Sequence, residues 1–395
     1  MKKVVIVGRG TAGVLGAMHL NTYLDRSKFE VEWKFDSSIP TQPVGEGTDL
    51  TMPLILHNCS DFDQGSLATL LGGCVKTGLK KTGWGDGHMF HHGFTGGAVG
   101  YHFQANMLQD YGFNYLKSKV KIDDSHVTSN EDIDADFVLD CSGRPKNLEE
   151  GFVTADNIVV NTAKVWQCPW DYPRFTHTLT LARPYGWVFG IPLSNRLSIG
   201  YLYNRNFATL DMIEDDIKEV FSEYNIKPSV DGNYIEFPSY YREENFNGRV
   251  GYSGNSSFFL EPIEATSTTV MDHCNRGMYD SIMGNTPIST LNANYTDILS
   301  HTQTLIMFNY YGGSAWDNDF WKYAEASAEN RMHSIKNDDL FQKLMHQSLE
   351  MVGTNNPVPV EGEEVLHSPW QQSNYALHLE HLGVEGKMRT LLSST

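Results

Sequence analysis

The sequence predicts an α/β fold: a Rossmann-type dinucleotide-binding module, an antiparallel β-sheet inserted into that module, and a C-terminal helical region. Three observations predict this order. Glycines follow a short apolar run at the N-terminus, short aromatic and β-branched segments fill the middle, and helical periodicity dominates after Pro287. With 395 residues, 40% of them hydrophobic, the chain is long enough for about two modules with large cores.

The N-terminal segment has the order strand, glycine turn, helix. Residues 4–7 form a short apolar run that is typical of a buried parallel strand, and apolar residues recur at helical spacing after the turn. Glycines let the backbone of such a turn approach a pyrophosphate, which binds at the helix N-terminus. We expect the cofactor-binding turn to contain Gly8, Gly10, Thr11, Ala12 and Gly13.

A second strand, residues 31–35, ends at Asp36, where a carboxylate can bind ribose hydroxyls. Residues 136–145 again indicate a buried strand and a glycine turn, and we expect that strand in the same sheet. We assign residues 1–152 and 250–286 to the nucleotide-binding module, 153–249 to the inserted sheet and 287–395 to the helical region.

The inserted sheet is interrupted by one amphipathic helix. Its apolar face consists of Met212, Ile213, Ile217, Val220, Phe221 and Tyr224. Beyond Pro287 three helical segments are expected, followed by a looser tail after Gly353.

Composition excludes several classes of function. A formal net charge of -18 disfavours nucleic acid and anionic lipid as partners. Five cysteines without metal-site spacing indicate unpaired thiols, and no apolar run reaches the length of a membrane span, so we expect a soluble, cytoplasmic protein. His378 and His381 lie one helical turn apart without a recognisable third ligand, so no metal is expected.

Four stretches together resemble the flavin-dependent halogenases of the tryptophan-halogenase family: GRGTAG (8–13), IPTQPVGEGT (39–48), GWVFGIP (186–192) and GNSSFFLEPIEATS (254–267). The resemblance implies a glutathione-reductase-like FAD-binding module. It also implies that reduced FAD, oxygen and a halide (chloride, bromide or iodide) yield hypohalous acid, which halogenates a small aromatic or heteroaromatic substrate. A separate NAD(P)H-dependent flavin reductase would supply the reduced FAD.

The resemblance also implies the two catalytic residues. The spacing in KTGLKKTGW is similar to the family pattern K-x-G-[IL]-K-x-x-x-W and selects Lys76 as the catalytic lysine. Lys80 and Lys81 are interpreted as surface lysines on a basic turn. Glu264 is then the carboxylate near the lysine, which polarises the halogen donor, stabilises the cationic ring intermediate or accepts the ring proton.

Thr266 and Ser267 are implied to bind the halide. The family usually has E-S-T-G where this chain has Glu264 to Ser267, so we expect Ser267 to restrict the backbone or to alter the halide pocket.

Trp187 and Phe189, in a variant of the family's W-x-W-x-I-P, are expected to form a wall between flavin and substrate.

Further residues follow from the same resemblance. His92 and Phe94 are similar to the stretch whose rings enclose the substrate. The other expected cofactor-binding residues are Val44, Gly45, Glu46, Trp187, Ile191, Pro192 and Leu260. A flavin monooxygenase (hydroxylase) and a non-catalytic flavin-binding protein stay open as alternatives, and so does a homo-oligomer. Lys76 together with FLEPIEATS favours the halogenase.

Overall fold

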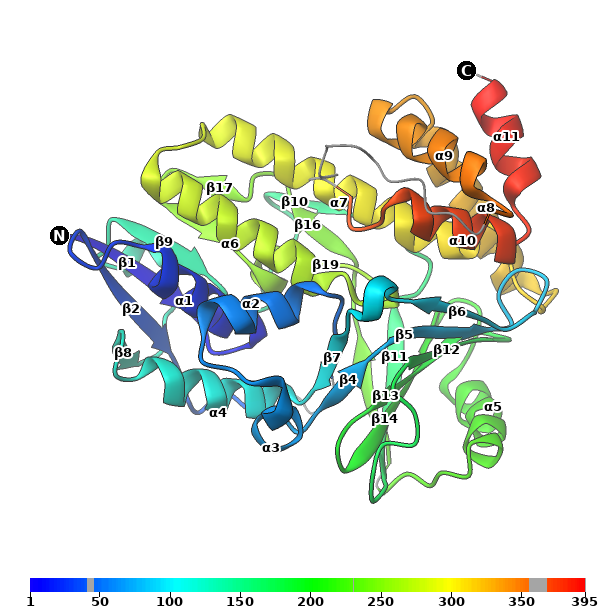
Figure 1. Ribbon diagram of the computed structural model, residues 1–395, viewed down its shortest axis with the longest axis horizontal. Coiled ribbons are helices and arrows are strands. Elements are labelled where there is room, and N and C mark those ends of the chain that lie inside the picture. Colours follow the sequence, from blue (N-terminus) through cyan, green and yellow to red (C-terminus); the bar gives the residue numbers. More distant parts are fainter. Residues whose placement is uncertain (41–45, 230, 355–367, 395) are drawn as a thin grey trace.

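Figure 1 shows the computed structural model, which describes residues 1–40, 46–229, 231–354 and 368–394. Val44 and Gly45 therefore lie outside the described residues. The N-terminal sheet and its helices lie at one end of the molecule, a second sheet lies beside them, and the C-terminal helices lie at the end opposite the N-terminus.

The N-terminal module contains a six-stranded sheet in the order β17-β18-β9-β1-β2-β8. β1 pairs in parallel with β2 and with β9, which confirms that the strand within residues 136–145 belongs to this sheet. The strands are β1 (Lys2–Val7), β2 (Phe29–Phe35), β8 (Lys121–Asp124), β9 (Phe137–Asp140), β17 (Phe246–Asn247) and β18 (Val250–Tyr252). Val4, Val5 and Ile6 are fully buried, as expected for a strand covered on both faces.

Helices cover this sheet. α1 packs against both α4 and α6, and α2 packs on α1 and α6. Their bounds are α1 (Thr11–Tyr23), α2 (Thr51–Cys59), α3 (Leu67–Leu71), α4 (Ala105–Leu116) and α6 (Ser267–Met283). Short 3-10 helices cover Gln64–Ser66, Thr95–Gly97, Asn130–Asp132, Gly254–Ser256 and Ile263–Ala265.

The second sheet has seven strands in the order β15-β11-β14-β13-β12-β5-β6. It is antiparallel except for the pairing of β12 with β5. The strands are β5 (Gly78–Thr82), β6 (Phe90–Gly93), β11 (Thr162–Pro169), β12 (Thr178–Arg183), β13 (Gly186–Pro192), β14 (Arg196–Tyr203) and β15 (Asn233–Glu236). The sequence did not predict that β5 and β6, which precede the expected insertion, complete this sheet.

The expected amphipathic helix is α5 (Leu210–Glu223), which buries Ile213, Ile217 and Val220 against this sheet. The described residues also form two three-stranded sheets. They consist of β10 (Phe152–Thr154), β16 (Tyr240–Arg242) and β19 (Phe258–Phe259), and of β3 (Glu46–Gly47), β7 (Gly100–Phe103) and β4 (Cys74–Lys76).

The C-terminal region is helical, and over residues 368–394 the expectation of a looser tail is wrong. Two helices, α10 and α11, pack on α9 (Figure 1). The helices are α7 (Ile288–Tyr310), α8 (Asp319–Ile335), α9 (Asp339–Met351), α10 (Gln372–His381) and α11 (Glu385–Ser393). All five cysteines are free thiols. Within the described ranges, every helix is too short or too polar to cross a membrane.

Candidate functional site

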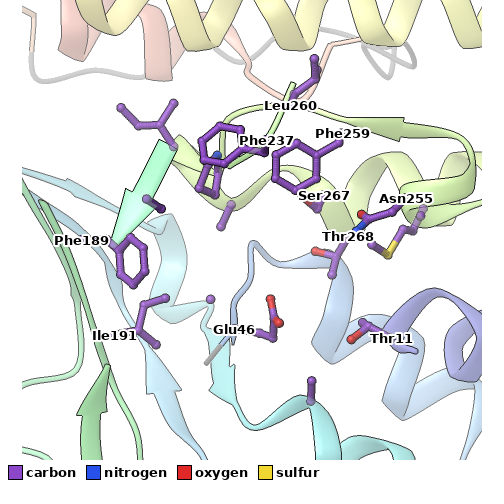
Figure 2. A pocket seen from close by; sticks show the side chains of 18 of the residues that line it. Thr11, Glu46, Phe189, Ile191, Phe237, Asn255, Phe259, Leu260, Ser267 and Thr268 are labelled. Atoms are coloured by element: carbon purple, nitrogen blue, oxygen red, sulfur yellow. The ribbon is translucent and has the colours of Figure 1, made fainter. Parts of the chain in front are cut away.

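A cavity of about 590 Å³ lies where the two large sheets and the N-termini of α1 and α6 meet. Figure 2 shows Phe189 and Ile191 on one side of it, Thr11 on the opposite side, and the side chain of Glu46 between them. Among the expected cofactor-binding residues, the cavity is lined by Gly10, Thr11, Ala12, Glu46, Trp187, Ile191 and Leu260. Gly8, Gly13, Asp36 and Pro192 stand outside this lining.

The glycine turn accepts only glycine at two positions. A Cβ on Gly8 would lie 2.2 Å from the carbonyl oxygen of Cys141, and a Cβ on Gly13 would lie 2.0 Å from that of Gly8. The turn therefore packs tightly against the end of β9, and α1 begins at Thr11, beside the cavity. A Cβ on Gly10 would meet nothing within 4 Å. This open position at a helix N-terminus fits a phosphate group of a dinucleotide.

Asp36 lies at the carboxyl end of β2, as the sequence predicted. Its carboxylate accepts a hydrogen bond from the backbone N–H of Ser38 at 2.9 Å and lies 3.1 Å from Nδ1 of His126. The hydrogen bonds from Ser38 hold the pKa of Asp36 below its usual value, so the side chain stays an acceptor.

Two aromatic rings of β13 form one wall of the cavity. Trp187 and Phe189 are buried, line the cavity, and have ring centroids 6.3 Å apart. The backbone of Gly200 allows this packing, since a Cβ there would lie 2.2 Å from the Phe189 ring. Behind the wall, Trp84 lies 6.5 Å from Trp187, centroid to centroid.

Glu261 supports this wall from inside the core. Nε1 of Trp187 donates a 2.6 Å hydrogen bond to its Oε1, and the hydroxyl of Tyr310 donates to the same oxygen. Oε2 has no hydrogen-bond partner in the part of the chain that the structure describes. Burial raises the pKa of Glu261 to about 8, so the side chain is mainly a neutral acid at pH 7.

Lys76 ends β4 and lines the cavity. The side chain is fully buried, and its Nζ has no hydrogen-bond partner among the described residues. The ring of Phe94 lies close to it, with its centroid 5.7 Å from Nζ. Burial lowers the pKa of Lys76 to about 8, although Glu264 and Asp49 oppose this shift. Lys76 therefore loses its proton more readily than an exposed lysine does.

The segment after Glu261 turns sharply into α6. Glu264 and Ala265 have φ angles of 67° and 56°, a left-handed conformation that costs free energy for residues other than glycine. Ser267 is the first residue of α6 and has no positive φ, so serine causes no such strain there. Thr266 is buried and Ser267 lines the cavity. The N-terminus of α6 thus opens toward the cavity.

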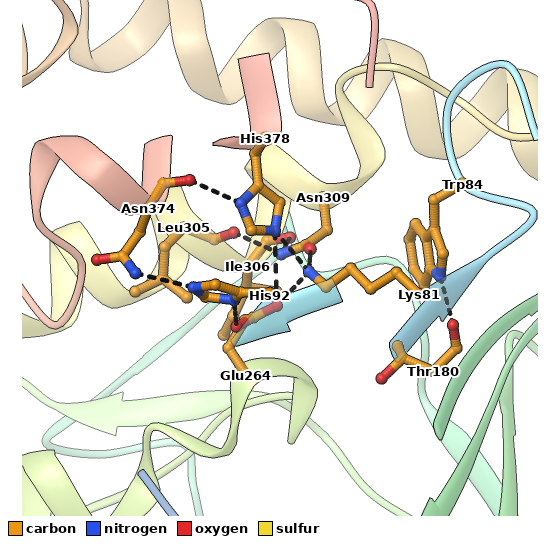
Figure 3. Close-up of polar contacts among 10 residues, drawn as sticks. All are labelled: Lys81, Trp84, His92, Thr180, Glu264, Leu305, Ile306, Asn309, Asn374 and His378. Carbon is orange, nitrogen blue, oxygen red and sulfur yellow. Dashed lines mark hydrogen bonds and ion pairs between the residues drawn. The ribbon is translucent and has the colours of Figure 1, made fainter. Parts of the chain in front are cut away.

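Lys81 is not a surface residue, and the expectation that it lies on an exposed turn is wrong. Its side chain is 0% exposed and forms an ion pair with Oε1 of Glu264. Nζ also donates to Oδ1 of Asn309 and lies 2.8 Å from Nε2 of His378 (Figure 3). Leu79 and Lys81 share one face of β5, and both are buried. The alternation of β-strand side chains could have revealed this orientation.

Hydrogen-bond partners identify the tautomers of the two histidines around Glu264. Oδ1 of Asn374 accepts from the N–H of Gln371, so its Nδ2 donates to Nε2 of His92 at 2.8 Å. Nδ1 of His92 then carries the proton that is donated to Oε2 of Glu264 at 2.8 Å. Nδ1 of His378 donates to the carbonyl oxygen of Asn374 at 2.7 Å. Its Nε2 is therefore free to accept from Lys81, and both imidazoles are neutral.

This polar cluster gathers residues that sequence spacing could not bring together. His92 belongs to this cluster, and neither His92 nor Phe94 lines the cavity. Ligand atoms of His92, Glu264 and His378 lie within 4.8 Å of one another, a grouping that can hold a metal. Here the Lys81 ammonium already contacts Glu264 and His378.

Comparison with known proteins agrees with this architecture. A family model described as tryptophan halogenase matches residues 3–123 and 114–356. The tryptophan 7-halogenase RebH of Lentzea aerocolonigenes is 23% identical over 318 residues, which cover 72% of this chain and 59% of that protein. The tryptophan 6-halogenase SttH of Streptomyces toxytricini is 25% identical over 268 residues, covering 60% and 51%. The chain thus spans between half and three-fifths of the length of these relatives.

Solved structures show the same fold. BrvH, a flavin-dependent halogenase from Brevundimonas sp. BAL3, superposes with a TM-score of 0.77 at 17% identity, covering 100% of this chain and 94% of that one. A tryptophan halogenase from Shewanella frigidimarina gives 0.75 at 16% identity, covering 100% and 93%. With a family model matched over more than half of its length and this fold, the chain belongs to the tryptophan halogenase family.

Proposed function

We propose that this protein is a flavin-dependent halogenase that uses reduced FAD, oxygen and a halide to halogenate a small aromatic or heteroaromatic substrate. One observation carries the proposal. Lys76 and Glu264 line the same cavity as Gly10 and Thr11 of the glycine turn, so a lysine suited to receive halogen opens onto a dinucleotide-type site.

The cavity residues fit FAD. Gly10 offers open space at the N-terminus of α1, and Asp36 presents an ionised carboxylate at the end of β2. Bound in this cavity, reduced FAD would supply hypohalous acid from oxygen and halide. Family membership supports this cofactor, and the residues proposed to hold it are Gly8, Gly10, Thr11, Ala12, Gly13, Asp36, Glu46, Trp187, Ile191, Pro192 and Leu260.

The halide is assigned to the N-terminus of α6. The first N–H groups of a helix have no intrahelical partner and favour anions. Thr266 and Ser267 add hydroxyl groups at this helix end, and Ser267 lines the cavity. Asp49 accepts from the hydroxyl of Thr268 at 3.1 Å and from that of Thr269, which orders the first turn.

Lys76 and Glu264 act on the substrate side. The buried Nζ of Lys76, without a hydrogen-bond partner among the described residues, binds the halogen donor and directs it to the ring. Substitution of a ring hydrogen releases a proton, and Glu264 is the carboxylate assigned to accept it or to stabilise the cationic ring. Trp187 and Phe189 would keep the organic substrate from the flavin.

The test is product mass spectrometry with free reduced FAD, with chloride, bromide and iodide compared over a panel of small aromatic substrates. A separate NAD(P)H-dependent reductase would supply the flavin, because the sequence contains only one glycine fingerprint. Wild type should add halogen to at least one substrate. Lys76→Ala should abolish this product while flavin reoxidation continues, and Lys80→Ala is the matched control.

Two outcomes would contradict the proposal. Addition of one oxygen atom instead of halogen would indicate a hydroxylase. Flavin binding without any product would indicate a non-catalytic flavin-binding protein.

A further inference from the structure

Lys81 lies at the centre of the buried polar cluster around Glu264 (Figure 3). An ammonium group has three N–H donors, and three acceptors surround this one: Oε1 of Glu264, Oδ1 of Asn309 and Nε2 of His378. Asn309 is itself oriented, because its Nδ2 donates to the carbonyl oxygen of Leu305 at 2.8 Å. Lys81 thus forms hydrogen bonds with Asn309 and His378 and an ion pair with Glu264.

The cluster contains one cation and one anion. His92 and His378 are neutral in the tautomers that their partners impose. Burial opposes ionisation of Glu264, but Lys81, and after it His92, hold the pKa of Glu264 well below its usual value. Oε2 accepts a hydrogen bond from His92, and Oε1 forms the ion pair with Lys81.

Lys76, unlike Lys81, lacks polar partners among the described residues. It is as deeply buried as Lys81, yet its Nζ has no hydrogen-bond partner and forms no ion pair with any residue that the structure describes. The titratable groups that face it are Glu264, Asp49, Lys81 and His102. Burial holds the pKa of His102 well below its usual value, so this imidazole is neutral. The two carboxylates favour a charged Lys76, while Lys81 and burial disfavour it.

We propose that Lys81 is a positioning residue that binds Glu264 and thereby prevents this carboxylate from forming an ion pair with Lys76, so that Lys76 faces the cavity without a carboxylate partner. The inference rests on the proposed function, in which Lys76 receives the halogen. The left-handed backbone of Glu264, with φ of 67°, fits this role. Such a conformation persists where surrounding contacts determine it, and Lys81 and His92 supply those contacts.

A free amine matters for the chemistry. Its lone pair can attack the halogen of hypohalous acid: a nitrogen–halogen bond forms, the oxygen–halogen bond breaks, and the displaced hydroxide leaves as water with one N–H proton. Transfer to the ring then breaks the nitrogen–halogen bond and forms a carbon–halogen bond. The electron pair of the broken bond stays on nitrogen, and the proton lost by the ring ends on this nitrogen and restores the amine. An ammonium group has no lone pair for the first step.

The experiment measures the proton affinity of Lys76 without relying on turnover. The protein is labelled with acetic anhydride over a pH series, and modification of the peptide that contains Lys76 is measured by mass spectrometry. In wild type, Lys76 should reach half of its maximal reactivity near pH 8. In Lys81→Met, Glu264 is free to pair with Lys76, so this midpoint should rise by at least about one unit, roughly a tenfold loss of reactivity below the midpoint.

The double variant Lys81→Met/Glu264→Gln removes the carboxylate as well and should return the midpoint to the wild-type value or below. Lys80→Met, on the neighbouring position of β5, is the matched control and should leave the midpoint unchanged. The pH profile of aromatic halogenation should move upward in Lys81→Met by the same amount as the labelling midpoint. A midpoint that stays at the wild-type value in a folded Lys81→Met variant would overturn the inference.

Glu264→Gln keeps the test decisive where Lys81→Met fails to fold. If Lys81 already withholds Glu264, removal of its charge should lower the Lys76 midpoint by less than one unit. A larger fall would show that Glu264 pairs with Lys76 in wild type and would refute the role of Lys81. The two proposals can fail separately. If wild type does not halogenate but the labelling midpoints of Lys76 shift as expected, only the proposed function is refuted. If wild type halogenates but the midpoint in Lys81→Met equals that of wild type, only the role of Lys81 is refuted.

Discussion

Replacement of Glu261 by glutamine should change how the stability of the protein depends on pH. Glu261 is 1% exposed, and burial raises its pKa from 4.5 to about 8. An unfolded chain releases this proton near pH 4.5, whereas the folded protein keeps it up to about pH 8. The contribution of the neutral acid is therefore fully present below pH 4.5 and is lost progressively as the pH rises through about 8.

The size of this loss follows from the shift. One pKa unit corresponds to about 1.4 kcal/mol. A rise of the pKa from 4.5 to about 8 therefore lowers the free energy of unfolding by roughly 5 kcal/mol once the pH exceeds about 8. Glutamine stays neutral at every pH, and its carbonyl oxygen can accept the hydrogen bonds from Trp187 and Tyr310. Glu261→Gln should therefore lack this loss and should be the more stable protein at pH 8.

Urea unfolding followed by tryptophan fluorescence, at several pH values between 4.5 and about 8, measures the difference. The exposed Glu150 provides the control: Glu150→Gln should follow the wild-type pH profile. If the free energies of unfolding of wild type and Glu261→Gln run parallel across the window, Glu261 is ionised in the folded protein and the reasoning fails.

Three further predictions concern the cavity. Gly10→Ala should fold normally, because its Cβ meets nothing within 4 Å, but it should bind FAD weakly in a fluorescence titration. Gly386→Ala, at an equally open position, is the control. Equal FAD affinities of the two variants would contradict the assignment of the turn. Trp187→Ala/Phe189→Ala should allow oxygen to be added to the substrate at a cost of about 3 to 5 kcal/mol per ring; unaltered halogenation by the folded variant would count against the wall. Thr266→Val and Ser267→Gly should raise the halide concentration needed for half-maximal product while FAD affinity stays unchanged; altered FAD affinity with normal halide dependence would move the halide elsewhere.

Local patterns determined much of the fold. The order of apolar run, glycines and helical periodicity predicted β1, the turn and α1, because each of these signals depends on residues close together in the chain. The apolar face of α5 was legible for the same reason. By contrast, α10 and α11 were predicted as a looser tail. Helices this short gain most of their stability from tertiary packing rather than from their own sequence.

The identity of the partners around Glu264 was decided only by the tertiary structure. The sequence indicated Lys76 and Glu264 as the catalytic pair, yet the buried ion pair joins Glu264 to Lys81. That contact depends on β5, on the loop before α6 and on the ends of α7 and α10, which supply Asn309 and His378. The spacing of residues within one segment carries no information about which distant segment supplies the ion-pair partner of a charged side chain. Burial also changes proton affinity, so the lowered pKa of Lys76 is a property of the folded molecule.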